Sequence, residues 1–393
     1  MVFLSAFFNK KADSWIKGRK NQLQNISPKL KDWKNQKIGW IHAASYGEFE
    51  MSRPLIRTLQ SQFPNLKFVI SFYSPSGYEN IHFEDERFLK IYLERDIANL
   101  HVKYIEVIDP DFVVFIKYEF WFNFLRILKA RKIPFYFTSL HMNRDHYLFN
   151  PFFKAFLNLL KSSHQIFCHN KASDEILKEK GFSNISVLGD TRIKQVQLNK
   201  QNATIIQWSK PGQQTIIFGS CTLFESVMIY NYINSNPGYN FIIAPHDIDE
   251  HSISAFKDKI KRGTSLYSES IHTFKHEVLI IDTLGDLKHL YGNADVAYVG
   301  AGFEKGPHNV LEPLVYGIPV ITGPNIRKFP MAQLLKSKEL LFVIEKKNQL
   351  NQCIQNLFEV DSENFSDLCT VFFEENQTNL DIFTQEIKQL IGE

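Results

Sequence analysis

Residues 38–50 read IGWIHAASYGEFE, and this stretch decides the fold. Its first part, residues 38–44, is an apolar run with β-branched and aromatic side chains, which is typical of a buried strand. Small residues follow, and apolar residues then recur at helical spacing through residues 48–63. The stretch therefore predicts a strand, a short turn and a helix, which is the unit from which parallel sheets are built.

The same alternation continues through the first half of the chain. Further strand-like runs occupy residues 68–73, 91–93, 112–116, 135–138, 166–168 and 185–188. Longer stretches with helical spacing separate most of them, among them residues 120–131 and 173–180. Strands that alternate with helices predict a mostly parallel sheet with helices on both faces.

A second set of strands begins after a polar stretch, residues 194–214. Its members cover residues 215–218, 241–244, 278–281, 296–299, 319–322 and 341–344. Because 393 residues suffice for two cores, the predicted fold class is α/β, with two doubly wound, Rossmann-like domains facing a cleft. We expect a basic N-terminal segment at residues 1–36, one domain at 37–200 and a second at 201–393.

The N-terminal region is basic, with nine Lys or Arg and two Asp in residues 1–37, although the whole chain has a net charge of only +3. The weak overall charge does not indicate a nucleic-acid partner. The opening run VFLSAFF is far shorter than the roughly 20 residues of a transmembrane helix, and it makes a poor signal peptide. Aromatic residues beside lysines suit an anionic membrane surface, and a solvated basic helix packed on its own domain is the alternative. The four Cys are far apart, which suits a reducing compartment.

Glu48 is the first candidate for chemistry. It lies in the first turn of a predicted helix, where free N–H groups favour an anion, and Gly47 lets a ligand approach the backbone. The alternative is a capping box that needs no substrate, in which Ser45 caps the helix and Glu48 follows three residues later. Position alone favours the cap.

A second candidate site follows the strand at residues 296–299. Residues 300–313 read GAGFEKGPHNVLEP, and their glycine spacing is not that of a dinucleotide fingerprint. His308, Asn309 and Glu312 precede or open a helix, where a carboxylate beside backbone N–H groups suits a ribose diol and an adjacent phosphate. A helix start whose Glu binds its own backbone would explain Glu312 but not the other residues.

Polar segments also follow other predicted strands, and each alone is more often a turn than a site. Since carboxyl ends of parallel strands share one edge of a sheet, we expect these segments to surround one cleft. They are Tyr118-Glu119-Phe120-Trp121, Gly219-Ser220, Ala244-Pro245-His246 and Asp282-Thr283-Leu284-Gly285-Asp286.

Many short motifs in a fixed order make the chain resemble the 3-deoxy-D-manno-octulosonic acid (Kdo) transferases of lipopolysaccharide synthesis. The matching stretches, spread over nearly the whole chain, are Trp40-Ile41-His42-Ala43 with Ser45-x-Gly47-Glu48, Ser74-Pro75-Ser76-Gly77, Glu119-x-Trp121-x-Asn123, Asp282-Thr283-x-Gly285-Asp286-Leu287-x-x-Leu290-Tyr291 with Ala294-Asp295-Val296, and His308-Asn309-x-Leu311-Glu312-Pro313 with Gly317-x-Pro319-Val320.

The resemblance implies the glycosyltransferase B fold and transfer of Kdo, with inversion, from CMP-Kdo to the glucosamine 6'-hydroxyl of a lipid A precursor (lipid IVA). It implies no cofactor, no required metal, and a peripheral or weakly anchored place on the cytoplasmic face of the inner membrane. Glu48 matches the family's catalytic glutamate, proposed as general base, which reverses the preference for a cap. Ser45, Gly47 and Glu119 fall on the acceptor side. The residues implied for the nucleotide sugar are Ser220, His246, Thr283, Leu284, Gly285, Asp286, His308, Asn309 and Glu312.

The chain departs from the family pattern in two places. Pro245-His246-Asp247 stands where the family commonly has an arginine that meets the sugar nucleotide, and the apolar start is shorter than the family's membrane anchor. Two other hypotheses remain. Another enzyme of this fold, a UDP-sugar transferase or an epimerase, would prefer UDP to CMP. A non-catalytic membrane-surface scaffold would keep its function when Glu48 is replaced.

Overall fold

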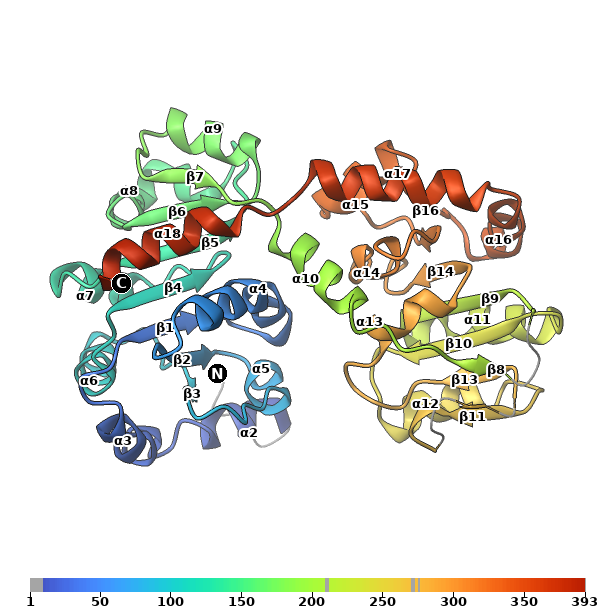
Figure 1. The fold of residues 1–393 in the computed structure, drawn as a ribbon, viewed down its shortest axis with the longest axis horizontal. Coiled ribbons are helices and arrows are strands. Elements are labelled where there is room, and N and C mark those ends of the chain that lie inside the picture. The colour runs from blue at the N-terminus through green and yellow to red at the C-terminus, as the bar shows by residue number, and fades with distance from the viewer. Residues whose placement is uncertain (1–9, 209–211, 270–272, 275, 393) are drawn as a thin grey trace. The chain divides into compact units, whose positions relative to one another are not determined.

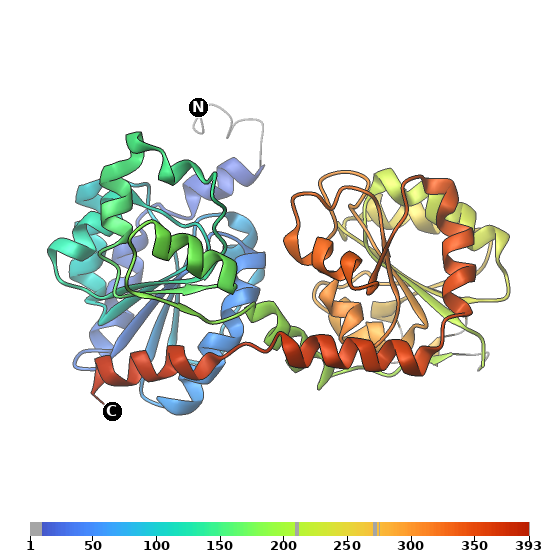
Figure 2. The same cartoon turned by 90° about the horizontal axis from the view of Figure 1, so that it is seen from above.

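The structure, a computed structural model, describes residues 10–208, 212–269, 273–274 and 276–392. The chain divides into two compact units. Unit 1 combines Met1–Gln195 with Gln377–Glu393, and unit 2 is Val196–Asn376. Each unit is a parallel sheet with helices on both faces (Figure 1, Figure 2).

Unit 1 is built on a seven-stranded parallel sheet with the order β3-β2-β1-β4-β5-β6-β7. Its strands are β1 Ile38–His42, β2 Lys67–Phe72, β3 Phe88–Tyr92, β4 Phe112–Ile116, β5 Phe135–Leu140, β6 Gln165–Cys168 and β7 Ile185–Val187. Its α-helices are α2 Lys10–Lys17, α3 Gln22–Asp32, α4 Tyr46–Gln62, α5 Pro75–Asn80, α6 Ala98–Ile108, α7 Phe122–Ala130, α8 Lys154–Leu160, α9 Lys171–Glu179 and α18 Leu380–Ile391, and α10 Thr191–Lys200 leads into unit 2. Two short 3₁₀ helices, η1 Tyr147–Phe149 and η2 Pro151–Phe153, precede α8.

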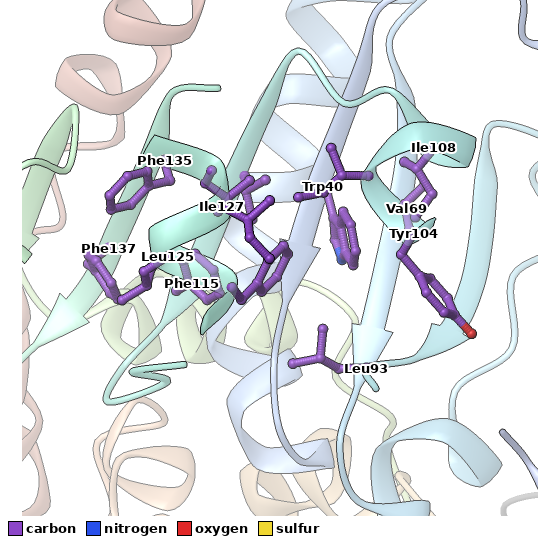
Figure 3. Close-up of a cluster of buried hydrophobic side chains, with 14 of the residues drawn as sticks. Trp40, Val69, Leu93, Tyr104, Ile108, Phe115, Leu125, Ile127, Phe135 and Phe137 are labelled. Atoms are coloured by element: carbon purple, nitrogen blue, oxygen red, sulfur yellow. The ribbon is translucent and has the colours of Figure 1, made fainter. Parts of the chain in front are cut away.

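Both faces of this sheet are buried, which explains why its strands read as continuous apolar runs and not as alternating ones. Successive residues of β1 point to opposite faces. Trp40 and Phe115 belong to the cluster that packs against α3, α6 and α7 (Figure 3). Ile41 and Val114 belong to the cluster on the other face, which packs against α4 and α18.

Unit 2 repeats this plan with the strand order β11-β13-β10-β9-β14-β15-β16. Its strands are β9 Thr215–Cys221, β10 Asn240–Pro245, β11 Thr264–Leu266, β13 Val278–Ile280, β14 Val296–Val299, β15 Val320–Thr322 and β16 Leu341–Val343, and β8 Gln207–Trp208 pairs separately with β12 Thr273–Phe274. Its helices are α11 Leu223–Ser235, α12 Glu250–Lys257, α13 Leu287–Leu290, α14 Leu311–Leu314, α15 Pro330–Ser337, α16 Leu350–Phe358 and α17 Ser362–Glu375, with short 3₁₀ helices η3 Tyr267–Glu269, η4 Tyr291–Asn293 and η5 Lys347–Gln349.

The strand order of each sheet reverses at one place. In unit 1 the chain builds outward from β1 to β3 and then returns to the other side of β1 as β4. In unit 2 the reversal lies between β9 and β14. The connections on the two sides of such a point leave in opposite directions, so a crevice forms at the carboxyl ends of the two strands.

The predicted α/β class with two doubly wound parallel sheets is confirmed, and so is every predicted strand. The sequence does not predict β8, β11 or β12, because runs of two or three residues carry no usable periodicity. Helix α4 begins at Tyr46, so Gly47 lies inside the first turn and not ahead of the helix as expected.

The predicted domain limits need two corrections. The boundary lies between Gln195 and Val196, inside α10, and not after residue 200. The last helix, α18, belongs to unit 1, although the sequence predicts that the second domain continues to residue 393. Phe383 and Ile387 of α18 are buried in the same cluster as Leu55 of α4. Apolar spacing shows that a helix is amphipathic but does not say which sheet it covers.

The N-terminal region is not a separate segment where the structure describes it. Ile26, Leu30 and Trp33 are buried in the unit 1 core. The stretch VFLSAFF lies outside the described residues, so its proposed membrane contact stays a prediction. Within the described ranges, no helix is both long and apolar enough to cross a bilayer.

Arg19 fastens this region to the sheet. Its guanidinium donates to the carbonyl oxygen of Leu93 at 3.0 and 2.8 Å and to that of Tyr73 at 3.0 Å. It also lies 3.9 Å from the ring centroid of Trp15. Burial lowers the pKa of Arg19 to about 10, which still leaves it charged at neutral pH.

We expect Arg19→Met to lower the free energy of unfolding by about 2–3 kcal/mol, because the carbonyl groups of Leu93 and Tyr73 lose a charged donor. The control is Lys20→Met, which changes an exposed neighbouring side chain. Urea unfolding followed by fluorescence measures both variants. Equal stability of the two variants would show that Arg19 does not fasten the N-terminal region.

Candidate functional site

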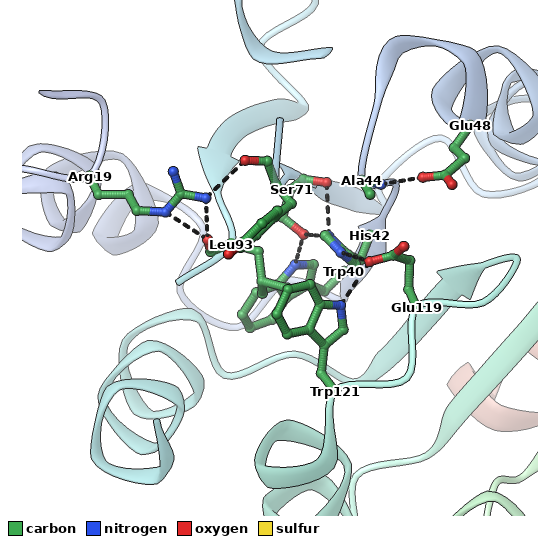
Figure 4. A network of polar contacts seen from close by, with 10 residues as sticks. Arg19, Trp40, His42, Ala44, Glu48, Ser71, Leu93, Glu119 and Trp121 are labelled. Carbon is green, nitrogen blue, oxygen red and sulfur yellow. Dashed lines mark hydrogen bonds and ion pairs between the residues drawn. The ribbon is translucent and has the colours of Figure 1, made fainter. Parts of the chain in front are cut away.

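A chain of buried hydrogen bonds crosses the β1/β4 switch point of unit 1 (Figure 4). His42, the last residue of β1, is fully buried. Its Nδ1 lies 2.9 Å from Ser71 Oγ, and its Nε2 lies 3.1 Å from Glu119 Oε2. Trp40 Nε1 donates to Ser71 Oγ at 2.8 Å, and Trp121 Nε1 donates to Glu119 Oε2 at 2.9 Å.

The indole donors fix the two ends of this chain. Indole nitrogen can only donate, so Trp40 donates to Ser71 Oγ and Trp121 donates to Glu119 Oε2. Between them, His42 Nδ1 lies 2.9 Å from Ser71 Oγ and 3.1 Å from Ser71 O, and His42 Nε2 faces the Glu119 carboxylate at 3.1 Å. These contacts orient Glu119 after β4.

Glu48 lies beside this chain, in the first turn of α4. Its Oε2 accepts from the Ala44 backbone N–H at 2.7 Å, as Figure 4 shows. Burial raises the pKa of Glu48 above its ordinary value, and the negative charge of Glu119 adds to the effect. Lys117, the Ala44 N–H and His42 oppose the rise. The carboxylate is therefore held in place while its affinity for a proton is increased.

The capping box proposed for this helix is not formed. Ser45 is at the N-cap position, but its side chain makes no cap hydrogen bond. Gly47 is exposed, and a Cβ added there would meet nothing within 4 Å. A ligand could thus approach the first turn of α4 at Gly47, although the fold itself does not need a glycine there.

The corresponding switch point of unit 2 has two strained residues. Ser220 at the end of β9 has φ 52°, and Ala301 after β14 has φ 68°, a region that non-glycine residues avoid. Glu225, fully buried in α11, keeps these loops in position. Its carboxylate accepts from the Ala301 N–H at 2.9 Å, from Tyr298 Oη at 2.7 Å and from the Thr222 N–H at 3.2 Å.

The glycines near this point serve the packing of the loops. A Cβ on Gly300 would come within 2.4 Å of Ser220 O, and a Cβ on Gly302 would come within 2.3 Å of Gly323 N. These residues therefore let the loops after β9, β14 and β15 touch one another. The sequence analysis did not recognise this role, nor that of Glu225.

His246 and His308 come together, with stacked rings whose centroids are 4.4 Å apart. Burial and the neighbouring His246 lower the pKa of His308 to about 4. A neutral imidazole at this place can donate one hydrogen bond and accept another. The pair joins the end of β10 to the loop that follows β14.

The loop after β13 contains a polar atom that lacks a partner. Thr283 Oγ1 is buried and has no hydrogen bond to any residue that the structure describes. Leu284 beside it is 56% exposed, Gly285 has φ 94°, and Asp286 begins α13 without capping it through its side chain. An unpaired buried hydroxyl is costly, so Thr283 marks a place where a ligand could supply the missing hydrogen bond.

Asn309 and Glu312 also come together, as the sequence predicts. Asn309 Nδ2 donates to Glu312 Oε1 at 3.2 Å. Burial raises the pKa of Tyr316 to about 12, and the Glu312 carboxylate contributes to the rise. The hydroxyl of Tyr316 in turn donates to Lys288 O at 3.1 Å, which links the 308–316 segment to α13.

One set of polar side chains at the strand ends of unit 1 is not predicted from the sequence. Lys117, His141, His169 and Arg192 all follow strands of unit 1, and their place after strand ends is the signal that could have found them. Among the described residues, no group of three or more His, Cys, Asp or Glu is placed to hold a metal ion. Asp249, in the acidic run after β10, has a structural role instead: its carboxylate caps α12 by accepting from the Ser252 N–H at 3.1 Å.

The sequence is similar to one family along much of its length. The model of the family described as 3-Deoxy-D-manno-octulosonic-acid transferase (kdotransferase) matches residues 18–195. The chain is 25% identical over 340 residues to a 3-deoxy-D-manno-octulosonic acid transferase of Haemophilus influenzae, a match that covers 81% of this chain and 78% of that protein. A transferase of the same name from Chlamydia muridarum is 25% identical over 351 residues, with the same two coverages of 81% and 78%.

Solved structures share the fold over 90% or more of the chain. A UDP-GlcNAc 2-epimerase from Neisseria meningitidis matches with a TM-score of 0.60 and 14% identity, covering 90% of this chain and 100% of that one. A glycosyltransferase from Rickettsia africae matches with a TM-score of 0.53 and 11% identity, covering 91% and 99%. At these identities the likeness concerns the fold alone, which is that of the glycosyltransferase B class.

Proposed function

Because the chain belongs to the Kdo transferase family and is therefore a glycosyltransferase, we propose that it moves Kdo from CMP-Kdo to the glucosamine 6'-hydroxyl of a lipid A precursor. The observation that carries the mechanism is the position of Glu48. Its carboxylate lies at the β1/β4 switch point, is fixed by the Ala44 N–H, and has a raised pKa. These are the properties of a general base.

In the proposed reaction Glu48 removes the proton of the acceptor hydroxyl. The oxygen attacks the anomeric carbon of Kdo, and the bond from that carbon to the CMP phosphate breaks. The electron pair of the broken bond leaves with CMP, and the configuration inverts. Glu119, held by His42 and Trp121, is placed to orient the acceptor and to keep the proton affinity of Glu48 high.

Unit 2 is the proposed binding unit for CMP-Kdo. The unpaired hydroxyl of Thr283, the Asn309–Glu312 pair and the neutral His308 supply polar groups for a nucleotide. Glu312 suits the ribose diol because a carboxylate accepts two hydroxyl hydrogen bonds. Ser220, His246, Leu284, Gly285 and Asp286 complete the proposed site.

We place the protein at the cytoplasmic face of the inner membrane, because a lipid acceptor must be reached from a membrane surface. Unit 1 offers aromatic side chains for such a contact before α8. Phe152 is 92% exposed and Tyr147 is 54% exposed, and the exposed Lys154 follows them. Aromatic rings beside a cation suit the interface of an anionic bilayer.

Product analysis tests the proposed function directly. Purified enzyme is incubated with lipid IVA and CMP-Kdo, and the products are examined by mass spectrometry. Addition of Kdo to the acceptor supports the proposal. Absence of transfer, together with tighter binding of UDP than of CMP, would instead favour a UDP-sugar enzyme of the same fold.

We expect Glu48→Gln to lower turnover by about 10²–10⁴-fold, because an amide cannot accept the acceptor proton. CMP binding should be unchanged, since Glu48 belongs to unit 1. In the wild type, turnover should fall as the pH decreases through the raised pKa of Glu48, because the base must be deprotonated. Near-normal turnover in the variant would show that Glu48 is not the base.

A pair of variants separates nucleotide from acceptor recognition. We expect Glu312→Ala to weaken CMP binding by about 1–3 kcal/mol, the value of buried hydrogen bonds to a ribose. Glu119→Gln should leave CMP affinity unchanged and depress transfer, and the amide still offers an oxygen to His42. Calorimetry with CMP measures the first effect and a transfer assay the second. The opposite pattern would mean that the two units have exchanged roles.

We expect Phe152→Ser to weaken co-sedimentation with anionic vesicles, because it removes the most exposed aromatic side chain among the described residues of unit 1. The matched control is Ile205→Ser in unit 2, where the side chain is 78% exposed. Equal loss in both variants, or no loss in either, would contradict the proposed membrane contact of this loop.

A further inference from the structure

Basic side chains gather at the carboxyl edge of the unit 1 sheet, and the proposed transfer step gives them no role. Lys117 follows β4, His141 follows β5, His169 follows β6, and Arg192 lies in the first turn of α10 after β7. Since all four follow neighbouring parallel strands, the topology brings them to one edge. The rings of His141 and His169 are 5.9 Å apart.

Arg192 is held in place but keeps part of its donor set free. Its Nε and Nη2 donate to the Asp190 carboxylate at 3.0 and 2.7 Å, and its backbone N–H donates to the same group at 3.0 Å. Nη1 has no hydrogen bond to any residue within the described ranges. His169 Nε2 lies 3.5 Å from Asp190 Oδ2. One carboxylate thus orients the guanidinium without occupying the whole of it.

Lys117 is the member of this cluster whose surroundings favour an anionic ligand. It is half-buried, and no carboxylate among the described residues is within ion-pair distance of its ammonium group. Burial lowers its pKa, and the positive charge of Arg192 lowers it further, while the negative charges of Glu48 and Asp190 act in the opposite direction. A desolvated ammonium without a close counterion is unfavourable, so an anion bound beside Lys117 would offset this cost.

The two histidines fit the same interpretation. Burial lowers the pKa of each ring, and Arg192 contributes to both shifts. Asp190 counters the shift of His169. Neutral imidazoles add N–H donors to the fixed charges of Lys117 and Arg192. Such a combination of charged and neutral donors is typical of protein sites for phosphate or carboxylate groups.

We infer that Lys117, His141, His169 and Arg192 form a binding site for an oxyanion carried by a substrate, either a phosphate monoester or a carboxylate. The inference deepens the proposed function and rests on it, because Lys117 interacts electrostatically with Glu48 and the site would hold the anionic group next to the general base. In that reaction the oxyanion belongs either to a phosphate of the acceptor or to the carboxylate of the transferred sugar. Binding of this group would position the reacting hydroxyl or the anomeric carbon.

The test uses the full-length protein and inorganic phosphate as the probe. Calorimetry at constant ionic strength measures its affinity for the wild type, Lys117→Gln, Lys117→Arg and the control Lys103→Gln, which changes an exposed lysine of α6. We expect at least a tenfold loss in Lys117→Gln, recovery to within threefold in Lys117→Arg, and no change in Lys103→Gln. Among the described residues the Lys117 ammonium group has no hydrogen-bond partner, so its replacement should not lower the melting temperature.

Steady-state kinetics of the same variants identifies the source of the oxyanion. A rise of KM for the acceptor alone assigns the site to an acceptor phosphate, and a rise of KM for the nucleotide sugar alone assigns it to the sugar carboxylate. Unchanged phosphate affinity in Lys117→Gln overturns the inference, even if the pH profile of transfer shifts, because Lys117 would then act only on the charge of Glu48. Phosphate binding is measured without transfer, so it can persist if the proposed function fails.

Discussion

The reversal of strand order in each sheet is the constraint on which the rest of the structure depends. Parallel strands need crossover connections, and the connections that leave β1 and β4 go to different faces of the sheet. The backbone at the carboxyl ends of these two strands is therefore uncovered. Glu48 follows β1 and Glu119 follows β4. In unit 2, Ser220 lies at the end of β9 and the 300–312 segment follows β14.

Burial of polar groups gives these edges their chemical character. In unit 1 the series from Trp40 to Glu119 satisfies its own hydrogen bonds, so it fixes one carboxylate without help from solvent. The fixed charge of Glu119 then acts on Glu48, whose pKa it raises together with desolvation. In unit 2 Glu225 has the corresponding structural role, because it holds the strained Ala301 in place from a fully buried position.

The fold alone does not distinguish the proposed reaction from that of its structural neighbours. A UDP-GlcNAc 2-epimerase shares the fold at 14% identity, so this fold supports several chemistries. The distinction depends on individual side chains at strand ends: the proposed base Glu48, the unpaired hydroxyl of Thr283, and the basic cluster at Lys117 and Arg192. Within the described ranges, Asp190 is the carboxylate in ion-pair contact with this basic cluster, through Arg192 and His169.

The sequence by itself determined the class of fold, the strands other than β8, β11 and β12, and the places of Glu48, Glu119, His308, Asn309 and Glu312 after strands. Buried parallel strands are continuous apolar runs, and such runs can be recognised locally without knowing what they pack against. Motif order then indicated the family, and the carboxyl ends of the strands indicated where chemistry should lie.

Only the tertiary structure decided that α18 covers the unit 1 sheet, that Arg19 fastens the N-terminal region, and that Ser45 does not cap α4. It also brought Lys117 within electrostatic range of Arg192, and it placed Glu225 where its carboxylate accepts a hydrogen bond from the Ala301 N–H. The physical reason is that these are contacts between distant segments. Periodicity describes which face of an element is apolar, whereas the partner of that face, and the charge that a buried side chain meets, depend on how the chain returns to the sheet.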